Sequence, residues 1–336
     1  MESGSGCSKF EDLNQVNIIT PTEHPMDSPA APTTTNFKGH QSKVQTCGWN
    51  VDGTMLASGS MDAVGLIWNF NGSAIKPQVT LRGHTDAIHA LQWNPTHPNY
   101  LATASTDRSL RVWDSRTQSG AGEKVVTPGE NINLSWSPDG NYIAVGNDDD
   151  VVTIVDARKL QILHQKKYPY QVNEIGWNTT GDHFFMSAFG SDATNKTSGT
   201  VEILKFEEDA SLTQQYTVQC HTAACYCIAF DPTGSLFAVG SADANVSLWT
   251  LEDAVCVAVV DRHENPIRAL SFNHDGTLIA SGSEHHYIDV ASTKTGARKH
   301  CVSTGSLTNS LHFHPKASVL AYSSDSAGYV SLCSGL

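Results

Sequence analysis

The stretch from Leu81 to Asp114 constrains the fold more than any other part of the chain. It contains three short runs in which apolar and polar residues alternate, and turn residues separate these runs. Gly83-His84 opens the stretch and Trp113-Asp114 closes it. An alternation with a period of two predicts β-strands, so this unit is expected to be all-β.

The same pattern recurs along the chain. An aromatic residue ends the first strand of each copy, and most neighbouring aromatics are about 40–45 residues apart, as in WD repeats. Seven such residues occur: Trp49, Trp93, Trp136, Trp177, Phe230, Phe272 and Phe313. Because each WD repeat forms one blade, the sequence predicts an all-β fold, a seven-bladed WD40 β-propeller. One interval is longer, and the excess is a polar insertion at 191–198 before the third strand of blade four.

The ends of the chain suggest how the ring closes. After Leu332 only Cys333 to Leu336 remain, too few for a fourth strand in the last blade. An open sheet edge would result, and the segment just before Gly39-His40 is placed to fill it. We expect residues 33–37 to form the outer strand of the last blade and 33–336 to be the propeller. Residues 1–32, rich in Pro, Thr and Ser, are expected to be a disordered or extended arm. Deleting the first 40 residues should destabilise the domain, whereas deleting the first 25 should not.

Composition narrows the class of partner. The 336 residues carry a net charge of −13, and no run of four or more basic residues occurs. A surface that follows phosphates needs clustered Lys and Arg, so tight direct binding of nucleic acid is disfavoured. The eight cysteines are scattered, which is typical of a reducing compartment. No apolar run long enough for a bilayer and no signal peptide are visible, so no membrane partner is expected.

A His before the first strand, a Ser or Thr on the second, an Asp in the next turn and a Trp on the third can form a hydrogen-bonded network. Buried polar groups of this kind must be paired. A hydrolase triad is the alternative, but a catalytic site has no reason to recur at the repeat period, so no enzyme activity is expected. The network residues are His40, Asp62 and Trp68, then His84, Asp107 and Trp113, and finally His221, Asp243 and Trp249.

Three groups resemble metal sites at first sight. Cys225 and Cys227 follow Cys220-His221, but we place both on one face of a single strand and find no second Cys-x-x-Cys pair. His285-His286 and His312-Phe313-His314 have no carboxylate or Cys partner nearby in the sequence. Core packing and solvated histidines are the preferred interpretations, so neither a metal nor a cofactor is expected.

An acidic turn at Asp148, Asp149 and Asp150 precedes the third strand of blade three. One of them replaces the repeat aspartate, and the others are expected to be exposed. Glu284 and Asp325 lie in the equivalent turns of blades six and seven. These residues could form an acidic patch on the Gly-His face, which bears the Gly-His loops, and Arg262 opens another loop there. Asp148, Asp149, Asp150, Arg262 and Glu284 are the candidate partner-binding residues.

Some stretches are more particular than the general WD pattern. Residues 129–140 read GENINLSWSPDG and lead to the aspartate-rich turn, and Val172-Asn173-Glu174-Ile175 and Gly240-Ser241-Ala242-Asp243 follow in register. From about Phe37 to its end, the chain resembles the THO complex subunit 3 family.

That resemblance implies a non-catalytic scaffold subunit of the nuclear THO/TREX complex, which couples transcription and mRNA processing to mRNA export. It implies binding to other THO subunits, mainly the large helical ones, and access through them to a DEAD-box helicase and adaptors, with RNA contacted indirectly. The alternative is a WD-repeat adaptor of another assembly, such as a ubiquitin-ligase substrate receptor or a histone-binding module.

Overall fold

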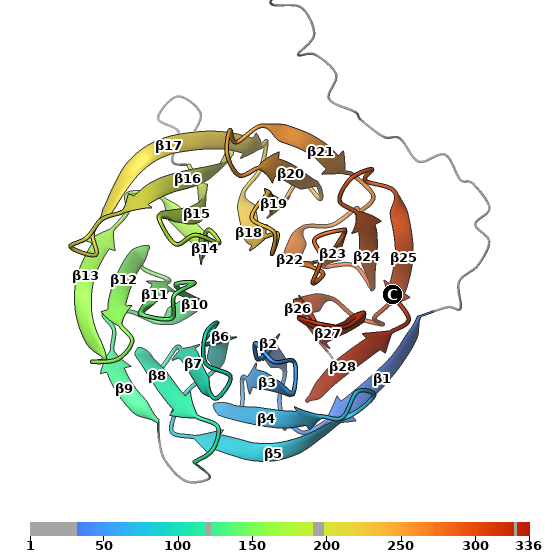
Figure 1. Cartoon of the computed structure of the whole chain (residues 1–336), viewed down its shortest axis with the longest axis horizontal. Coiled ribbons are helices and arrows are strands. Elements are labelled where there is room, and N and C mark those ends of the chain that lie inside the picture. Colours follow the sequence, from blue (N-terminus) through green and yellow to red (C-terminus); the bar gives the residue numbers. More distant parts are fainter. Residues whose placement is uncertain (1–31, 118–121, 191–197, 326–327) are drawn as a thin grey trace, which may run out of the picture.

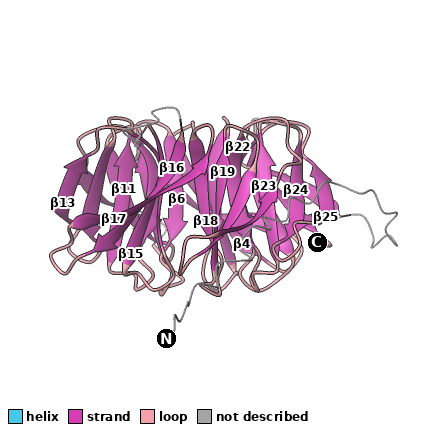
Figure 2. Cartoon of the chain, turned by 90° about the horizontal axis from the view of Figure 1, so that it is seen from above, coloured by secondary structure: helices cyan, strands magenta, loops and turns pink. Residues whose placement is uncertain are grey.

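The computed structural model describes residues 32–117, 122–190, 198–325 and 328–336, and all of the regular structure in these ranges is β-strand. Twenty-eight strands form seven four-stranded antiparallel sheets that are arranged around a central axis (Figure 1). Seen from the side, the molecule is a disc whose loops gather on its two faces (Figure 2). The expected seven-bladed propeller is therefore confirmed. Within the described ranges there is no helix long and apolar enough to cross a membrane.

The strands of each blade are given from the central axis outward. Blades one to three are β2 (Val44–Trp49), β3 (Met55–Ser60), β4 (Val64–Phe70) and β5 (Ile75–Arg82); β6 (Ile88–Trp93), β7 (Tyr100–Ser105), β8 (Ser109–Asp114) and β9 (Glu123–Val126); and β10 (Asn131–Trp136), β11 (Tyr142–Asn147), β12 (Val151–Asp156) and β13 (Gln161–Lys167). Blades four and five are β14 (Gln171–Trp177), β15 (His183–Phe189), β16 (Gly199–Phe206) and β17 (Leu212–His221); and β18 (Cys225–Phe230), β19 (Leu236–Ser241), β20 (Val246–Thr250) and β21 (Cys256–Val260). Blades six and seven are β22 (Ile267–Phe272), β23 (Leu278–Ser283), β24 (Tyr287–Ser292) and β25 (Arg298–Ser303); and β26 (Thr308–Phe313), β27 (Val319–Ser324), β28 (Tyr329–Ser334) and β1 (Thr33–Lys38).

The ring closes in blade seven, where the start of the chain meets its end. β1 pairs antiparallel with β28, from Thr33 opposite Ser334 to Lys38 opposite Tyr329. This pairing supplies the fourth strand that the C-terminal segment lacks, so closure by an N-terminal strand is confirmed. The expected arm lies almost entirely in residues 1–31, outside the described residues, and its boundary stays a prediction.

The hydrophobic core lies between the blades. The described residues form seven buried clusters, and each cluster draws its members from two neighbouring blades. Indole groups at the ends of first strands add hydrogen bonds across the same junctions. Trp93 donates to the carbonyl of Gly48 at 3.0 Å, and Trp49 donates to that of His312 in blade seven at 3.2 Å. The aromatic residues that mark the repeats therefore also join the blades.

Packing on both sides explains the small residues of the second strands. β3 and β7 are buried along almost their whole length because a neighbouring blade covers each face. At Gly59 in β3, an added Cβ would lie 2.6 Å from Cγ2 of Ile88 in blade two. A larger residue there would push the blades apart, since interiors of proteins are close-packed.

Candidate functional site

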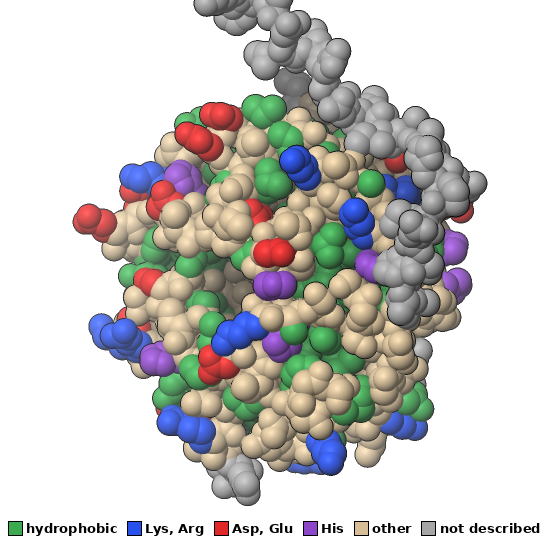
Figure 3. Space-filling view, turned by 45° about the vertical axis from the view of Figure 1, so that its right-hand side comes forward, with side chains coloured by type: hydrophobic (Ala, Val, Ile, Leu, Met, Phe, Trp, Pro, Cys, Tyr) green, Lys and Arg blue, Asp and Glu red, His purple; other side chains and the backbone are tan. Residues whose placement is uncertain are grey.

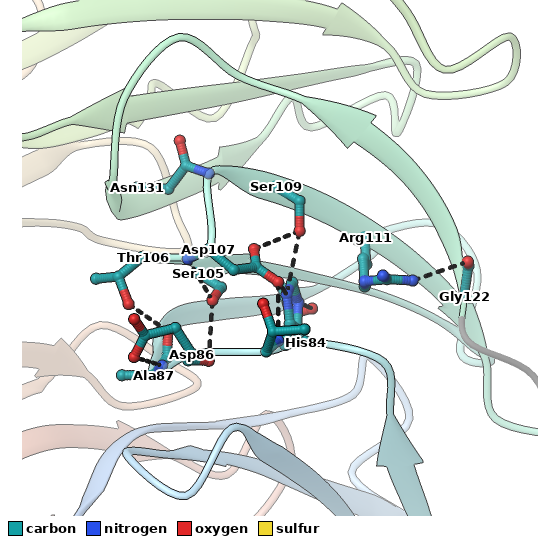
Figure 4. Close-up of polar contacts among 12 residues, drawn as sticks. His84, Asp86, Ala87, Ser105, Thr106, Asp107, Ser109, Arg111, Gly122 and Asn131 are labelled. Carbon is teal, nitrogen blue, oxygen red and sulfur yellow. Dashed lines mark hydrogen bonds and ion pairs between the residues drawn. The ribbon is translucent and has the colours of Figure 1, made fainter.

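The expected polar network is present in blade two, and Figure 4 shows its pair of His84 and Asp107. His84 lies within 2.9 Å of Oδ2 of Asp107 through Nδ1 and within 2.7 Å of the Thr103 hydroxyl through Nε2. Trp113 donates from Nε1 to the same hydroxyl at 2.8 Å. Two strands, the loop with His84 and the turn with Asp107 are thereby joined through buried side chains. Blade one repeats the arrangement, with Ser58 accepting from Trp68 at 2.8 Å and lying 2.7 Å from Nε2 of His40.

Blade five forms the same network with a different hydroxyl. We expected a Ser or Thr on the second strand, and this detail is wrong for blade five, because Val239 occupies that position in β19. Ser247 on the third strand takes over, accepting from Trp249 at 2.7 Å and lying 2.8 Å from Nε2 of His221. His221 also lies 3.0 Å from Asp243.

The electrostatics of these groups suit a structural role. Burial lowers the pKa of His84, although Asp107 opposes the effect. Burial alone would raise the pKa of Asp107, but hydrogen bonds from Ser109 and His84 outweigh it, so the pKa is lowered. A neutral imidazole is therefore held beside an ionised carboxylate, with its other nitrogen occupied by Thr103.

Blade six departs from the pattern and contains a cluster that the sequence did not reveal. His263 keeps its contact with Ser281 at 2.8 Å, but Ala291 stands where the Trp would be. The fully buried carboxylate of Asp289 instead pairs with two guanidinium groups. Arg262 reaches Oδ2 at 2.5 Å and Arg298 reaches Oδ1 at 2.5 Å. The signal that could have predicted this cluster is an aspartate within an apolar strand, which requires a positive partner.

Arg262 was expected on a surface loop as a partner-binding candidate. In the structure its side chain is only 12% exposed. Its Nε and Nη2 donate to Asp289, and its Nη1 donates to the carbonyl of Gly296 at 2.7 Å. All three guanidinium nitrogens are therefore hydrogen-bonded within blade six. Arg262 is a structural residue of blade six rather than a free surface charge.

The acidic turn of blade three is partly exposed. Asp149 stands at the repeat-aspartate position, since its backbone N–H bonds the side chain two residues earlier, as in the turns at Asp62 and Asp107. Asp148 and Asp149 are exposed, whereas Asp150 is half-buried and accepts from the backbone of Val172 in blade four at 3.0 Å. The expectation of exposure therefore fails for Asp150, because it connects two blades.

The other acids of the proposed patch are paired with cations. Glu284 accepts from Arg268 at 2.6 Å, and Asp325 forms an ion pair with Lys43. Both pairs are partly exposed, so a partner could still contact them. Among the described residues, the acids of blades six and seven do not form an uninterrupted acidic patch with those of blade three, because Arg268 and Lys43 neutralise Glu284 and Asp325.

The central channel was not foreseen as a site. A cavity of about 760 Å³ lies there, lined by residues of the first strands. Every first strand carries a β-bulge at the same place, and a bulge turns one extra side chain out of the alternation. The bulge residues are Gln45, His89, Ile132, Asn173, Tyr226, Arg268 and Asn309. Glu174 lines the channel, and burial raises the pKa of its carboxyl to about 7.

The bulge in β18 corrects one expectation about the cysteines. Cys225 and Cys227 were placed on one face of a strand, but the extra residue between them puts them on opposite faces. Cys225 packs in the cluster shared with blade four and Cys227 in the cluster shared with blade six. In the part of the chain that the structure describes, no group of three or more His, Cys, Asp or Glu residues could hold a metal ion.

Comparisons with known proteins agree with the blade geometry. The family model of the THOC3 beta-propeller domain matches residues 40–323. THO complex subunit 3 of Arabidopsis thaliana is 44% identical over 291 residues, which cover 86% of this chain and 89% of that protein. WD repeat-containing protein AAC3 of Dictyostelium discoideum is 31% identical, covering 86% of this chain and 63% of that protein.

A solved structure shows the same fold at low sequence identity. The β-propeller domain of Cps50 (Swd1) from Myceliophteria thermophila superposes with a TM-score of 0.77 at 16% identity, over 89% of this chain and 99% of that one. The match to the family model extends from His40 to Ser323 and thus includes blades one to six and the first two strands of blade seven. The chain therefore belongs to the THO complex subunit 3 family of WD-repeat β-propellers.

Proposed function

We propose that this chain is a non-catalytic scaffold subunit of a THO-type complex in the nucleus, where it helps to couple transcription and mRNA processing to mRNA export. The observation that carries the proposal is the match to the THO subunit 3 family over residues 40–323. Its direct partners are other THO subunits, mainly the large helical ones. A DEAD-box helicase and adaptors are reached through the complex.

The repeated polar networks support a non-catalytic role. The His-Asp pairs in blades one, two and five have closely similar geometry, and each imidazole is held by a buried hydroxyl. A repeated arrangement that joins strands in three separate blades is explained by stability. A catalytic centre would need a polar group that the other blades lack, placed beside a binding pocket.

Surface charge supports indirect contact with RNA. The net charge is −13, and on the face shown in Figure 3 the basic and acidic side chains are interspersed. Three basic side chains of the Gly-His face, Lys43, Arg262 and Arg268, are paired with acids. A protein that follows a phosphate backbone needs a continuous positive surface instead.

A pull-down of the tagged chain from nuclear extract, treated with nuclease and analysed by mass spectrometry, tests the proposal. We expect the large helical THO subunits to be recovered after nuclease treatment, because protein contacts hold the assembly. Recovery of a cullin complex or of histone machinery without THO subunits would contradict the proposal and favour the alternative adaptor function.

Two matched variants test whether the acidic turn takes part. Asp148→Lys reverses an exposed charge on the Gly-His face, and Asp253→Lys reverses an exposed charge in the turn between β20 and β21, on the opposite face. If the turn with Asp148 and Asp149 contacts a partner, only the first variant should lower recovery. Equal recovery with both variants would remove Asp148, Asp149 and Asp150 from the candidates, whereas Glu284 needs its own variant.

A further inference from the structure

The seven outer strands differ in how their open edges are protected. An unpaired strand edge can join another strand, and proteins commonly prevent this with charged residues or proline. Five outer strands carry such residues: Lys38 in β1, Lys76, Pro77 and Arg82 in β5, Glu123 and Lys124 in β9, Lys166 and Lys167 in β13, and Arg298 and Lys299 in β25. The two remaining outer strands, β17 and β21, contain no Lys, Arg, Asp, Glu or Pro.

β17 and β21 are neighbours around the rim of the disc (Figure 1). Side chains of Val218 and Cys220 from β17 and of Cys256 from β21 belong to one hydrophobic cluster. We define the uncharged rim as β17 together with Val255–Val260. β17 has ten residues and is the longest strand of the described chain. The open edge is therefore both long and unprotected.

The uncharged rim also exposes large apolar side chains. Tyr216 is 63% exposed, Val255 is 54% exposed and Val257 is 42% exposed. Val257 is the extra residue of a β-bulge in the pairing of β20 with β21, which turns it outward. Outer strands β1, β5 and β25 expose no comparable apolar side chain, and β9 and β13 expose one each, Val126 at 66% and Leu163 at 41%. Exposed apolar side chains that gather in one place mark interaction surfaces.

Three polar side chains of β17 are hydrogen-bonded to acids of blade four. Gln214 donates to Glu202 at 2.6 Å, and Thr217 donates to the same carboxylate oxygen at 2.9 Å. Glu202 is 1% exposed, so its charge lies beneath the strand. Thr213 donates to Glu207 at 2.6 Å. What β17 offers a partner is therefore its backbone edge, the ring of Tyr216 and the exposed side chains of Gln215 and Gln219.

We propose that the uncharged rim is a docking site for an extended, uncharged segment of a partner protein that adds a strand to blade four. Backbone groups of that segment pair with the open edge of β17, and its apolar side chains pack on Tyr216, Val255 and Val257. The charge pattern selects this occupant, because neither β17 nor Val255–Val260 carries a charged side chain that could pair with a charge buried against the rim. The proposal rests on the proposed function, in which the partner is a THO subunit.

A pair of lysine variants tests the site. Tyr216→Lys puts a charge on the edge of β17. Thr35→Lys is the control, because Thr35 is exposed and holds the same register position in β1, opposite Leu332, as Tyr216 holds opposite Ile203. In the nuclease-treated pull-down we expect Tyr216→Lys to lower recovery of the THO subunits at least tenfold and Thr35→Lys to lower it less than twofold. Equal recovery with both variants would overturn the proposal.

Two further measurements separate the possible outcomes. Amide hydrogen exchange of the recovered assembly should show protection of β17 and no change in β25, whereas unchanged exchange in β17 would exclude strand addition. If Tyr216→Lys instead turns a dimer of the purified chain into a monomer, the occupant is a second copy and the proposal is wrong.

Failure of the proposed function can be recognised separately. If the wild-type chain recovers no THO subunit, that function is wrong, but the docking site is still tested by a photoreactive residue at position 216. A cross-link formed at position 216 and not at position 35, with a partner whose β17-facing segment is identified as extended and uncharged, supports the site. Absence of cross-links, or equal cross-linking from the two positions, overturns it.

Discussion

Blades two and six start from the same strand geometry and stabilise their interiors differently. In blade two, Thr103 accepts from Trp113 and contacts His84, so a large indole fills the space behind the second strand. In blade six, Ser281 still contacts His263, but Ala291 replaces the indole.

Blade six is stabilised by buried ion pairs at the place where blade two is stabilised by a large buried side chain. Asp289 holds Arg262 and Arg298, and the ring of Tyr287 stacks on His263 with centroids 5.0 Å apart and an interplanar angle of 10°. The hydroxyl of Tyr287 donates to the carbonyl of Arg262 at 2.7 Å. The repeat therefore requires a filled and hydrogen-bonded space rather than one particular set of residues.

The largest effect is expected when the indole of blade two is removed. Trp113 is 3% exposed, and replacing a buried Trp by Ala leaves a cavity, so Trp113→Ala should lower the free energy of unfolding by about 4 kcal/mol. Trp113→Phe keeps most of the volume and loses the hydrogen bond to Thr103, so it should cost about 1.5 kcal/mol. Denaturant unfolding measures both changes. A cost for the alanine variant no larger than for the phenylalanine variant would show that volume is not what stabilises blade two.

This contrast also explains what could be predicted from the sequence. The network of blade two was predicted because His84, Asp107 and Trp113 recur at fixed positions in a motif of short range. The cluster of Asp289 was not predicted, because its three members come from separate segments and none belongs to the motif. The bulges in the first strands were missed for a related reason. One extra residue shifts the alternation of side chains, and the position of that shift depends on how two strands pair.

The second-largest effect is expected for Asp289→Ala, which tests whether the stability of blade six depends on its buried charges. Asp289→Ala should cost about 3 kcal/mol, because removing one member of a buried ion pair leaves its partners without compensation. Arg298 is 42% exposed and can return to water, whereas Arg262 is 12% exposed and cannot do so easily. The matched control is Glu284→Ala, which breaks the exposed pair with Arg268 and should cost less than about 1 kcal/mol. Similar losses for the two variants in thermal or denaturant unfolding would show that the buried charges of blade six are not essential.

The smallest effect is the change of the free energy of unfolding with pH, which is expected to differ between blade six and blade two. Burial lowers the pKa of His263 to about 4, with Asp289 acting in the opposite direction and Arg262, Arg298 and His285 adding to the decrease. The unfolded chain binds this proton below about pH 6.5 and the folded chain only near pH 4, so stability is lost as the pH falls through that window. The loss from His263 should reach about 2 kcal/mol at pH 5, since each pH unit contributes about 1.4 kcal/mol.

His263→Gln removes the titrating group and can keep a hydrogen bond to Ser281, so it isolates this contribution. The free energy of unfolding of the variant should depend less on pH between 6.5 and 5 than that of the wild type. His84→Gln is the matched variant in blade two, where burial also lowers the histidine pKa but Asp107 lies 2.9 Å away and stabilises the protonated ring. We therefore expect a smaller change of slope for His84→Gln. Equal slopes for the wild type and His263→Gln would mean that blade six admits a protonated histidine as readily as the unfolded chain does.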